Sequence, residues 1–253
     1  MNKYLKNLNR IEFVVTMACT GHCKHCSQGE HRGFSEHING DYVSKAIRDV
    51  CSEYQIQSLM TFGGEPLLYP EDVNKIHAAA TEAGIPKREM ITNGFFSKSK
   101  ERIREVTHML AESGLNYIML SVDAFHEETI PLEFVSFFAD CARDEGIPIK
   151  LHPAWLVSKE NDNQYNKRTR EILLKFTEKG FEVSSGNVIW PEGNAKKYLS
   201  EYFDENIEYI NPYADDGSRD VWSLCFNSNG DVLNGNIYKN CIMDILKAYS
   251  IDV

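Results

Sequence analysis

The sequence predicts an α/β protein in which helices cover a parallel sheet, and three observations support this fold class. The composition is that of a packed domain, with 42% hydrophobic and 25% charged residues in a chain of 253. Short apolar runs alternate with amphipathic stretches. A helix-ending glycine precedes four of the runs, at Gly84, Gly114, Gly146 and Gly180. Such alternation specifies parallel strands joined by helical crossovers, in either an open doubly wound sheet or a barrel.

Six β/α units account for the alternation. The expected strands are short and apolar, and they cover residues 11–16, 58–62, 89–92, 117–122, 149–152 and 182–189. The first two helices are expected near residues 42–54 and 70–83, and the later helices end at the glycines. Six units fall short of a complete eight-fold barrel, which typically needs about 250 residues.

The C-terminal part of the sequence, from about residue 202, breaks this rhythm. Asn229 and Gly230 lie between the apolar runs 224–226 and 231–233, which predicts a hairpin. An amphipathic stretch near residues 242–249 predicts a closing helix. We therefore expect a core over residues 1–200 and a C-terminal cap over residues 201–253.

Charge and hydropathy restrict the partners. Lys+Arg number 27 against 37 Asp+Glu, so the net charge is −10 and no nucleic-acid partner is expected. The sequence has no apolar stretch of about 18 residues and no signal-peptide run at its start, so we expect no membrane partner and a cytoplasmic location. In that reducing compartment the seven cysteines are thiols or metal ligands rather than disulfides.

Cys19, Cys23 and Cys26 follow the first expected strand with the spacing C-x3-C-x2-C. Iron–sulfur clusters usually take four cysteines, so a three-cysteine loop leaves one iron of a [4Fe-4S] cluster open to another ligand. The alternative is a structural zinc site with His22, His25 or a distant residue as fourth ligand. That alternative would make the chain a zinc-structured binding protein without turnover.

The cysteine motif and its place after the first strand make the sequence similar to the radical S-adenosylmethionine (radical SAM) superfamily, over roughly residues 11–200. The resemblance implies an enzyme with a partial (β/α)6 TIM-like barrel and a short C-terminal hairpin-plus-helix extension. It also implies that S-adenosylmethionine binds the open iron and is cleaved reductively. The resulting 5′-deoxyadenosyl radical takes a hydrogen atom from a substrate, while the protein aligns the reacting bond and excludes water.

The resemblance assigns cofactor-binding roles to loops after the second, third and fourth strands. Gly63, Gly64 and Glu65 resemble the Gly-Gly-Glu motif that holds the methionine ammonium, where glycine permits close approach and Glu65 suits a cation. Further pocket residues are implied in the same way: Thr92 and Asn93 as lining, and Ser121 and Asp123 as ribose contacts. Each also has a purely structural alternative, as a turn, a strand end or a helix start.

Three other positions are implied to contact the cofactor. Ile189 falls where the superfamily backs the adenine, and His25 occupies the position of an aromatic residue before the third cysteine. His152 alternates with Lys150 on the fifth strand and is expected at the barrel mouth, where a cation meets the methionine carboxylate. A single histidine is more often structural.

Cys225 and Cys241 flank the predicted hairpin and resemble a remnant of the cysteine-rich extensions of peptide-modifying superfamily members. Two cysteines are too few for an ordinary auxiliary cluster. One hypothesis makes Cys225 a hydrogen-atom donor to a substrate radical, as a cysteine is in the peptide epimerases of the superfamily. The other makes both residues buried, small and apolar.

The expected substrate is a ribosomally made peptide, modified by epimerisation, cross-linking or a related step. The acidic composition and the cysteine-bearing tail favour it. A small metabolite and a partner protein to be activated are the alternatives. In each case the resemblance implies an electron donor such as flavodoxin or ferredoxin.

Overall fold

The computed structural model describes residues 2–31, 33–204, 206–207, 209, 211 and 220–250, so parts of the expected cap lie outside the described residues. The strands there are β1 (Arg10–Val14), β2 (Ser58–Phe62), β3 (Lys87–Thr92), β4 (Tyr117–Leu120), β5 (Ile149–Leu151), β6 (Ala154–Trp155), β7 (Glu182–Val183), β8 (Asn187–Val188), β9 (Ser223–Phe226), β10 (Asp231–Val232) and β11 (Gly235–Asn236). The α-helices are α1 (Gly40–Cys51), α2 (Pro70–Glu82), α3 (Lys100–Glu112), α4 (Ala124–Glu127), α5 (Leu132–Asp144), α6 (Gln164–Thr177), α7 (Gly193–Tyr198) and α8 (Ile242–Ala248).

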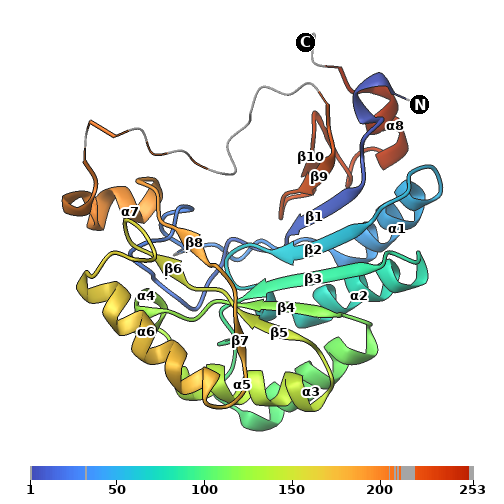
Figure 1. Ribbon diagram of the computed structural model, residues 1–253. Helices are drawn as coiled ribbons and strands as arrows, with labels where there is room; N and C mark the ends of the chain where they lie inside the picture. Colours follow the sequence, from blue (N-terminus) through green and yellow to red (C-terminus); the bar gives the residue numbers. More distant parts are fainter. Residues whose placement is uncertain are drawn as a thin grey trace.

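Seven strands form one parallel sheet in the order β7-β5-β4-β3-β2-β1-β9. The sheet is curved, and α1, α2, α3, α5 and α6 lie along its convex side (Figure 1). It does not close on itself among the described residues. The predicted partial barrel of α/β class is therefore confirmed. Gly84, Gly114, Gly146 and Gly180 all have positive φ angles, as expected of residues that end helices.

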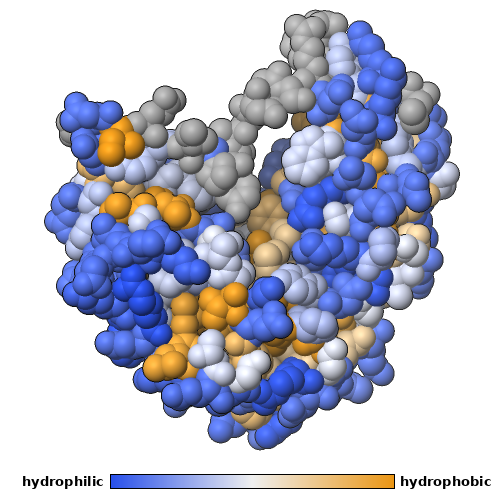
Figure 2. All heavy atoms as spheres, in the orientation of Figure 1, coloured by the Kyte–Doolittle hydropathy of each residue, from blue (hydrophilic) through white to orange (hydrophobic). Residues whose placement is uncertain are grey.

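The two faces of the sheet differ because side chains alternate along each strand. On β1, Ile11 and Phe13 are fully buried against the helices. Arg10 and Glu12 point to the other, concave face, where Arg10 donates hydrogen bonds to Glu12 (2.6 Å) and to Glu89 of β3 (3.0 Å). Figure 2 shows a hollow on this side of the molecule, between the flank that carries α7 and the flank that carries α8. The convex side thus holds the core, whereas the concave side carries charged residues among its side chains.

The fifth and sixth predicted strands are each divided into two short strands. β5 pairs with β4 and β7, whereas β6 pairs with β8. Pro153 separates β5 from β6, and residues 184–186 separate β7 from β8. A Cβ atom on Gly186 would lie 2.2 Å from the Pro153 carbonyl oxygen, so the two breaks pack directly against each other.

The turn predicted at Asn229 and Gly230 is present, with the Asn227 N–H donating to the Asp231 carbonyl (2.8 Å), but the predicted strand pairing is wrong. Residues 224–226 belong to β9, which pairs in parallel with β1, and the antiparallel pair is β10 with β11. The reason is burial: Leu224 and Phe226 are 0% and 1% exposed at the edge of the main sheet. The Phe226 ring lies 4.9 Å from the Phe13 ring, measured between centroids. The expected helix near residues 242–249 is present as α8.

In the described part of the chain, no helix combines the length and the apolar composition needed to cross a bilayer.

Candidate active site

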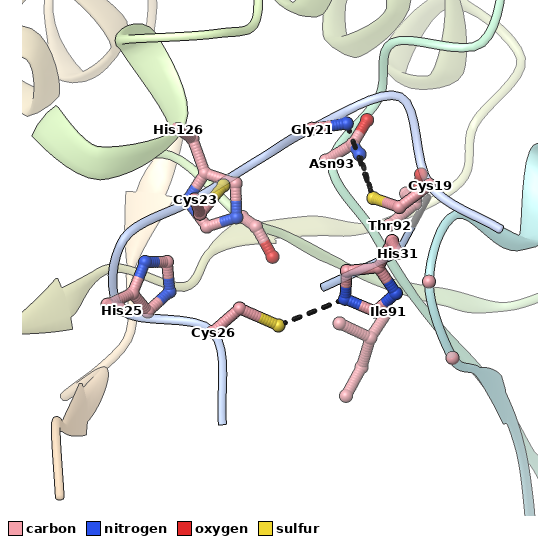
Figure 3. A pocket seen from close by; sticks show the side chains of 13 residues that line it. Cys19, Gly21, Cys23, His25, Cys26, His31, Ile91, Thr92, Asn93 and His126 are labelled. Carbon is pink, nitrogen blue, oxygen red and sulfur yellow. Dashed lines mark hydrogen bonds between the residues drawn. The ribbon is translucent and has the colours of Figure 1, made fainter. Parts of the chain in front are cut away.

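The carboxyl ends of β1, β2, β3 and β4 meet around one pocket of about 120 Å³ (Figure 3). Parallel strands bring their carboxyl ends to the same edge of a sheet, and sites form there. The pocket is lined by Cys19, Gly21, Cys23, His25, Cys26, His31, Gly63, Gly64, Ile91, Thr92, Asn93, Ser121 and His126. The structure therefore brings the cysteine motif together with the expected loops of the next three strands.

The three cysteines lie on the loop that follows β1. Two consecutive turns shape it: the Cys26 N–H donates to the Cys23 carbonyl (3.2 Å), and the Gly29 N–H donates to the Cys26 carbonyl (3.2 Å). Burial, aided by the charge of Glu65, raises the pKa of Cys19 to about 12, and burial also raises the pKa of Cys26. Without a metal these two thiols keep their protons, so metal binding here would release protons.

Gly63 and Gly64 place the loop after β2 directly against the start of the cysteine loop. Gly63 has a φ angle of +137°, and a Cβ atom on it would lie 2.4 Å from the Thr16 carbonyl oxygen. A Cβ atom on Gly64 would lie 2.1 Å from the Ala18 carbonyl oxygen. The Gly64 N–H also donates to the Thr16 carbonyl (2.7 Å). Only glycine permits an approach this close at both positions.

The Glu65 carboxylate is fully buried and joins the loop after β2 to the end of β3. Its Oε1 accepts hydrogen bonds from the Leu67 N–H (2.9 Å) and the Thr92 hydroxyl (2.7 Å), and its Oε2 accepts one from the Asn93 N–H (2.8 Å). Burial raises the pKa of Glu65 to about 7, against the effect of these hydrogen bonds. Glu65 does not line the pocket, and its contact with an ammonium group stays a prediction. In the structure it fixes Thr92 and Asn93, which do line the pocket.

Ser121 lies in the pocket wall, whereas Asp123 is buried behind it. Asp123 caps α4 by accepting hydrogen bonds from the N–H groups of Phe125 and His126, both at 3.0 Å, and it accepts another from the Ala154 N–H (3.0 Å). Its Oδ1 also lies 2.9 Å from Nδ1 of His126. Ribose contacts by Ser121 and Asp123 stay predictions.

The Asp123–His126 pair is charged in the structure. Burial alone would raise the pKa of Asp123 and lower that of His126. Their mutual attraction outweighs burial, so the pKa of Asp123 is held well below its usual range and that of His126 well above it. The contact with Asp123 thus favours the protonated form of the His126 imidazole, which lines the pocket beside Cys23.

His25 lines the pocket, as expected. Its ring lies 5.0 Å from the rings of both Phe125 and His126, measured between centroids. Its Nδ1 atom is buried and has no hydrogen-bond partner among the described residues. Burial lowers the pKa of His25 to about 4, so the ring is neutral. Adenine contact by His25 stays a prediction.

Sequence reasoning missed His31 and His126, because it found no grouping of histidines beyond His22 and His25. The Nδ1 atom of His31 lies 2.6 Å from the Met17 carbonyl oxygen, and its Nε2 atom lies 3.1 Å from the Cys26 sulfur (Figure 3). His126 follows Asp123 by three positions, so both face the same side of one helical turn. That spacing is the signal that points to His126; for His31 only its nearness in sequence to Cys26 does so.

His152 and Ile189 do not line the pocket. His152 hydrogen-bonds through Nδ1 to the Ser184 hydroxyl (2.9 Å), and burial lowers its pKa. Lys150 pairs with Glu182 of β7 (3.2 Å). Ile189 is 4% exposed and packs in an apolar cluster with Cys23. The cofactor contacts implied for His152 and Ile189 stay predictions.

Cys225 and Cys241 are both exposed, so the alternative that they are buried and apolar is wrong. Cys225 lies opposite Glu12 of β1. Its neighbours on β9, Leu224 and Phe226, point into the core, so Cys225 points to the concave face. The Cys241 sulfur lies 4.0 Å from Asp49 of α1. The two thiols thus lie in different surroundings, and only Cys225 lies on the concave face.

The residues around the pocket fit an iron–sulfur cluster with a bound organic cofactor better than a single zinc ion. Among the described residues, the only His/Cys/Asp/Glu group with ligand atoms all within 4.8 Å is Cys23, His25 and His126, which includes one cysteine of the motif. Three sulfurs spread around one pocket suit a multi-iron cluster. Gly63 and Gly64 line the pocket without side chains, and the unpartnered nitrogen of His25 offers the cofactor a polar atom.

Comparison with known proteins agrees with this fit. The family model described as the Radical SAM superfamily matches residues 13–203. The solved structure of SuiB from Streptococcus suis bound to S-adenosylmethionine is 14% identical, with a TM-score of 0.58 over 98% of this chain and 67% of that chain. Native anSMEcpe with bound AdoMet is 15% identical, with a TM-score of 0.59 over 95% of this chain and 80% of that chain.

A curated relative, GTP 3',8-cyclase from Desulforamulus reducens, is 25% identical over 187 residues. The match covers 69% of this chain and 55% of that protein, so the chain spans about half the length of the relative.

The parallel sheet and the three-cysteine loop at its carboxyl edge define an α/β iron–sulfur protein of the partial-barrel type. The chain belongs to the radical SAM superfamily.

Proposed function

We propose that Cys19, Cys23 and Cys26 bind the cluster, that S-adenosylmethionine occupies the adjoining pocket, and that the enzyme abstracts a hydrogen atom from a ribosomally made peptide. One observation carries this proposal: the three cysteines and the ends of β2, β3 and β4 converge on one pocket. The cysteines supply three sulfur ligands and leave one iron for the second cofactor.

The cluster and S-adenosylmethionine supply reductive cleavage and hydrogen-atom abstraction when bound. The chain's own residues orient and enclose them. Gly63 and Gly64 let the loop after β2 pack against the cysteine loop, and Glu65 fixes the neighbouring wall at Thr92 and Asn93. The Asn93 side-chain nitrogen lies 3.6 Å from the Cys19 sulfur, so it stands between the cysteine loop and β3. Such a wall excludes water from the reacting atoms.

A peptide substrate fits the open concave side. Arg10, Glu12 and Cys225 share the concave face of the sheet, Cys225 is exposed there, and Figure 2 shows a hollow on this side of the molecule that could admit an extended chain. Two proteins of similar fold have been solved with peptides, SuiB with precursor peptide SuiA and anSMEcpe with the Cp18Cys peptide. These likenesses support the peptide class without identifying the peptide.

Cys225 is proposed to return a hydrogen atom to the substrate radical. Cys225 is exposed as a residue, but the protein atoms around its sulfur partly desolvate it and raise its pKa to about 11, with a smaller contribution from Glu12, so the sulfur keeps its hydrogen at neutral pH. A thiol can donate a hydrogen atom, whereas a thiolate has none. Donation forms a C–H bond on the substrate and leaves a thiyl radical. One electron from a ferredoxin or flavodoxin and one proton from solvent then restore the thiol.

Anaerobic reconstitution tests the first part of the proposal. The wild-type chain is expected to bind iron and sulfide and, with a reductant, to release 5′-deoxyadenosine from S-adenosylmethionine. Cys241→Ala serves as a control because this thiol lies away from the hollow. A wild-type chain that takes up zinc but no iron–sulfur cluster would overturn the cysteine assignment, and a reduced cluster that never yields 5′-deoxyadenosine would overturn the pocket assignment.

Deuterium incorporation tests the donor role. In D2O, the wild-type enzyme is expected to give a product with deuterium at the reacting carbon, and Cys225→Ala is expected to form 5′-deoxyadenosine without that label. Cys241→Ala is the matched variant and should label normally. Unchanged labelling by Cys225→Ala would dismiss the donor role and leave the rest of the proposal intact.

A small metabolite is the second candidate substrate. The relationship to GTP 3',8-cyclase favours it, as does the similar fold of BtrN, solved with AdoMet and 2-DOIA. Cys225 discriminates between the two classes, because an enzyme that rearranges a small molecule needs no thiol on the concave face. A Cys225→Ala variant with undiminished turnover of a metabolite would favour this second candidate.

A further inference from the structure

Asn194, in the first turn of α7, holds both turns of the cysteine loop. Its side-chain Nδ2 donates a hydrogen bond to the Cys23 carbonyl (3.1 Å), and its backbone N–H donates one to the Cys26 carbonyl (2.9 Å). These two carbonyls are also the acceptors of the turn bonds from Cys26 and Gly29. One residue outside the loop therefore fixes the peptide groups of two of the three cysteines.

The geometry points to Asn194 as a positioning residue for the cluster, which sets the loop so that the Cys23 and Cys26 sulfurs face the pocket. The inference rests on the proposed role of the three cysteines. Asn194 does not itself line the pocket. It acts through the backbone of the loop.

Gly193 shows how closely α7 approaches the loop. It has a φ angle of +52°, and a Cβ atom on it would lie 2.3 Å from the Ser27 carbonyl oxygen and 2.6 Å from the Cys26 carbonyl oxygen. The backbone of α7 thus packs directly on the backbone of the cysteine loop at this point. The N–H groups of the first helical turn have no partner within the helix, so the Asn194 N–H is available to the loop.

The contact between Asn194 and the cysteine loop is buried. Asn194 is 5% exposed, and the bond from its side chain to Cys23 is shielded from solvent. Ala195 and Leu199 of the same segment are fully buried and belong to an apolar cluster that includes Cys23. This packing does not involve the Asn194 amide, so α7 stays docked when the amide is removed. The amide can therefore be tested apart from the helix.

A metal-retention experiment tests the inference. The wild-type chain, Asn194→Ala and Asn194→Asp are loaded anaerobically, and iron release to a ferrous chelator is followed. Asn194→Asp keeps the size and the backbone N–H bond but replaces the amide donor with an acceptor. Both variants are expected to release iron about tenfold faster, the lower end of the effect of outer contacts on metal sites.

Asn116 provides the matched control. It also makes two hydrogen bonds, from Nδ2 to the Pro86 carbonyl (2.9 Å) and to Oδ1 from the Arg88 N–H (2.9 Å), but it lies before β4, at the opposite end of the strands. Asn116→Ala is expected to lower the melting temperature while iron release stays at the wild-type rate. Equal acceleration in Asn116→Ala and Asn194→Ala would reduce Asn194 to a general stability role and overturn the inference.

Hydrogen exchange in the metal-free chain gives a second readout that does not depend on the cluster. Amides of residues 19–29 are expected to exchange faster in Asn194→Asp than in the wild type, while the amides of β2 and β3 exchange unchanged. Iron release and loop exchange at wild-type rates in Asn194→Asp would overturn the inference even if activity fell. Failure of the wild type to bind iron would instead count against the cysteine assignment, because the exchange measurement stands without metal.

Discussion

The carboxyl ends of β1–β4 and those of β5–β8 are built differently. The first four strands have four to six residues each, and each is followed by a loop that contributes to the cysteine pocket. The last four have two or three residues each, divided by breaks at Pro153 and Gly186, and none of their residues lines that pocket. The regular half thus forms the cofactor site, and the irregular half contributes no side chain to its lining. We infer that the cofactor site ends at β4.

The largest expected effect lies in the regular half. Cys23→Ala removes one of three sulfur ligands, so the variant is expected to lose its cluster and with it all formation of 5′-deoxyadenosine. Iron and sulfide analysis with electron paramagnetic resonance of the reduced protein measures this. Cys141→Ala is the control, because that thiol packs on the core from α5. A Cys23→Ala variant that still holds a full cluster would contradict the assignment of the cofactor site to the β1–β4 half.

Glu65→Gln is expected to have the next largest effect. The Glu65 carboxylate accepts three hydrogen bonds. In Gln an amide NH2 group replaces one of the two acceptor oxygens, so at least one of the three donors would face another donor. We expect a loss of about 2 kcal/mol in the free energy of unfolding, typical of hydrogen bonds to a charged group. Because Thr92 and Asn93 then lose their anchor, affinity for S-adenosylmethionine should fall as well.

Glu89→Gln separates these two effects. Glu89 is 2% exposed on the same strand as Thr92, but it pairs with Arg10 and Lys87 toward the other end of the sheet. We expect Glu89→Gln to be destabilising while it leaves the affinity for S-adenosylmethionine unchanged. Denaturant unfolding and anaerobic calorimetry measure the two quantities. Equal losses of affinity in both variants would show that Glu65 acts through general stability.

Local sequence signals were sufficient for the regular half. The apolar runs placed β1–β4 correctly, and Gly84 and Gly114 marked the helix ends before β3 and β4, because each unit closes over a short stretch of chain. The motif positions Gly63, Gly64, Asn93 and Ser121 could be located for the same reason, since the ends of neighbouring parallel strands meet at one edge.

Contacts between distant parts of the chain could not be obtained from the sequence. The pairing of β9 with β1 depends on Phe226 packing against Phe13, more than 200 positions away, whereas the Asn-Gly turn predicted a local hairpin. The hydrogen bonds from Asn194 to the cysteine loop likewise depend on tertiary packing. Glu65 was placed correctly after β2, but its partners on β3 could not be foreseen from its charge.

A buried histidine on the convex side of the β1–β4 half predicts that the stability of the protein depends on pH. His77 of α2 is fully buried and bonded to the Thr61 hydroxyl (3.0 Å). Burial, helped by the charge of Arg88, lowers its pKa to about 3. The unfolded chain therefore binds a proton at His77 that the folded chain excludes, so the His77 contribution to stability falls as the pH drops from about 6.5 toward 3, by up to about 1.4 kcal/mol per pH unit, whereas Glu65 with its raised pKa contributes in the opposite direction.

The double variant His77→Leu, Thr61→Val should remove this slope, because it replaces both partners of the hydrogen bond by apolar groups. Urea unfolding at pH 7 and pH 5 measures the difference from the wild type. Thr61→Val alone keeps the histidine and should keep the slope. A double variant with the wild-type slope would assign the pH dependence to other groups.

The smallest expected effects compare the two halves directly. Ser121 lines the pocket at the end of β4, whereas His152 at the end of β5 is engaged with Ser184. Ser121→Ala should weaken S-adenosylmethionine binding about threefold to tenfold, the worth of one hydrogen bond. His152→Ala should leave that affinity unchanged, because its ring faces the irregular half. If His152→Ala weakened binding as much as Ser121→Ala did, the cofactor site would extend onto β5 and would not end at β4.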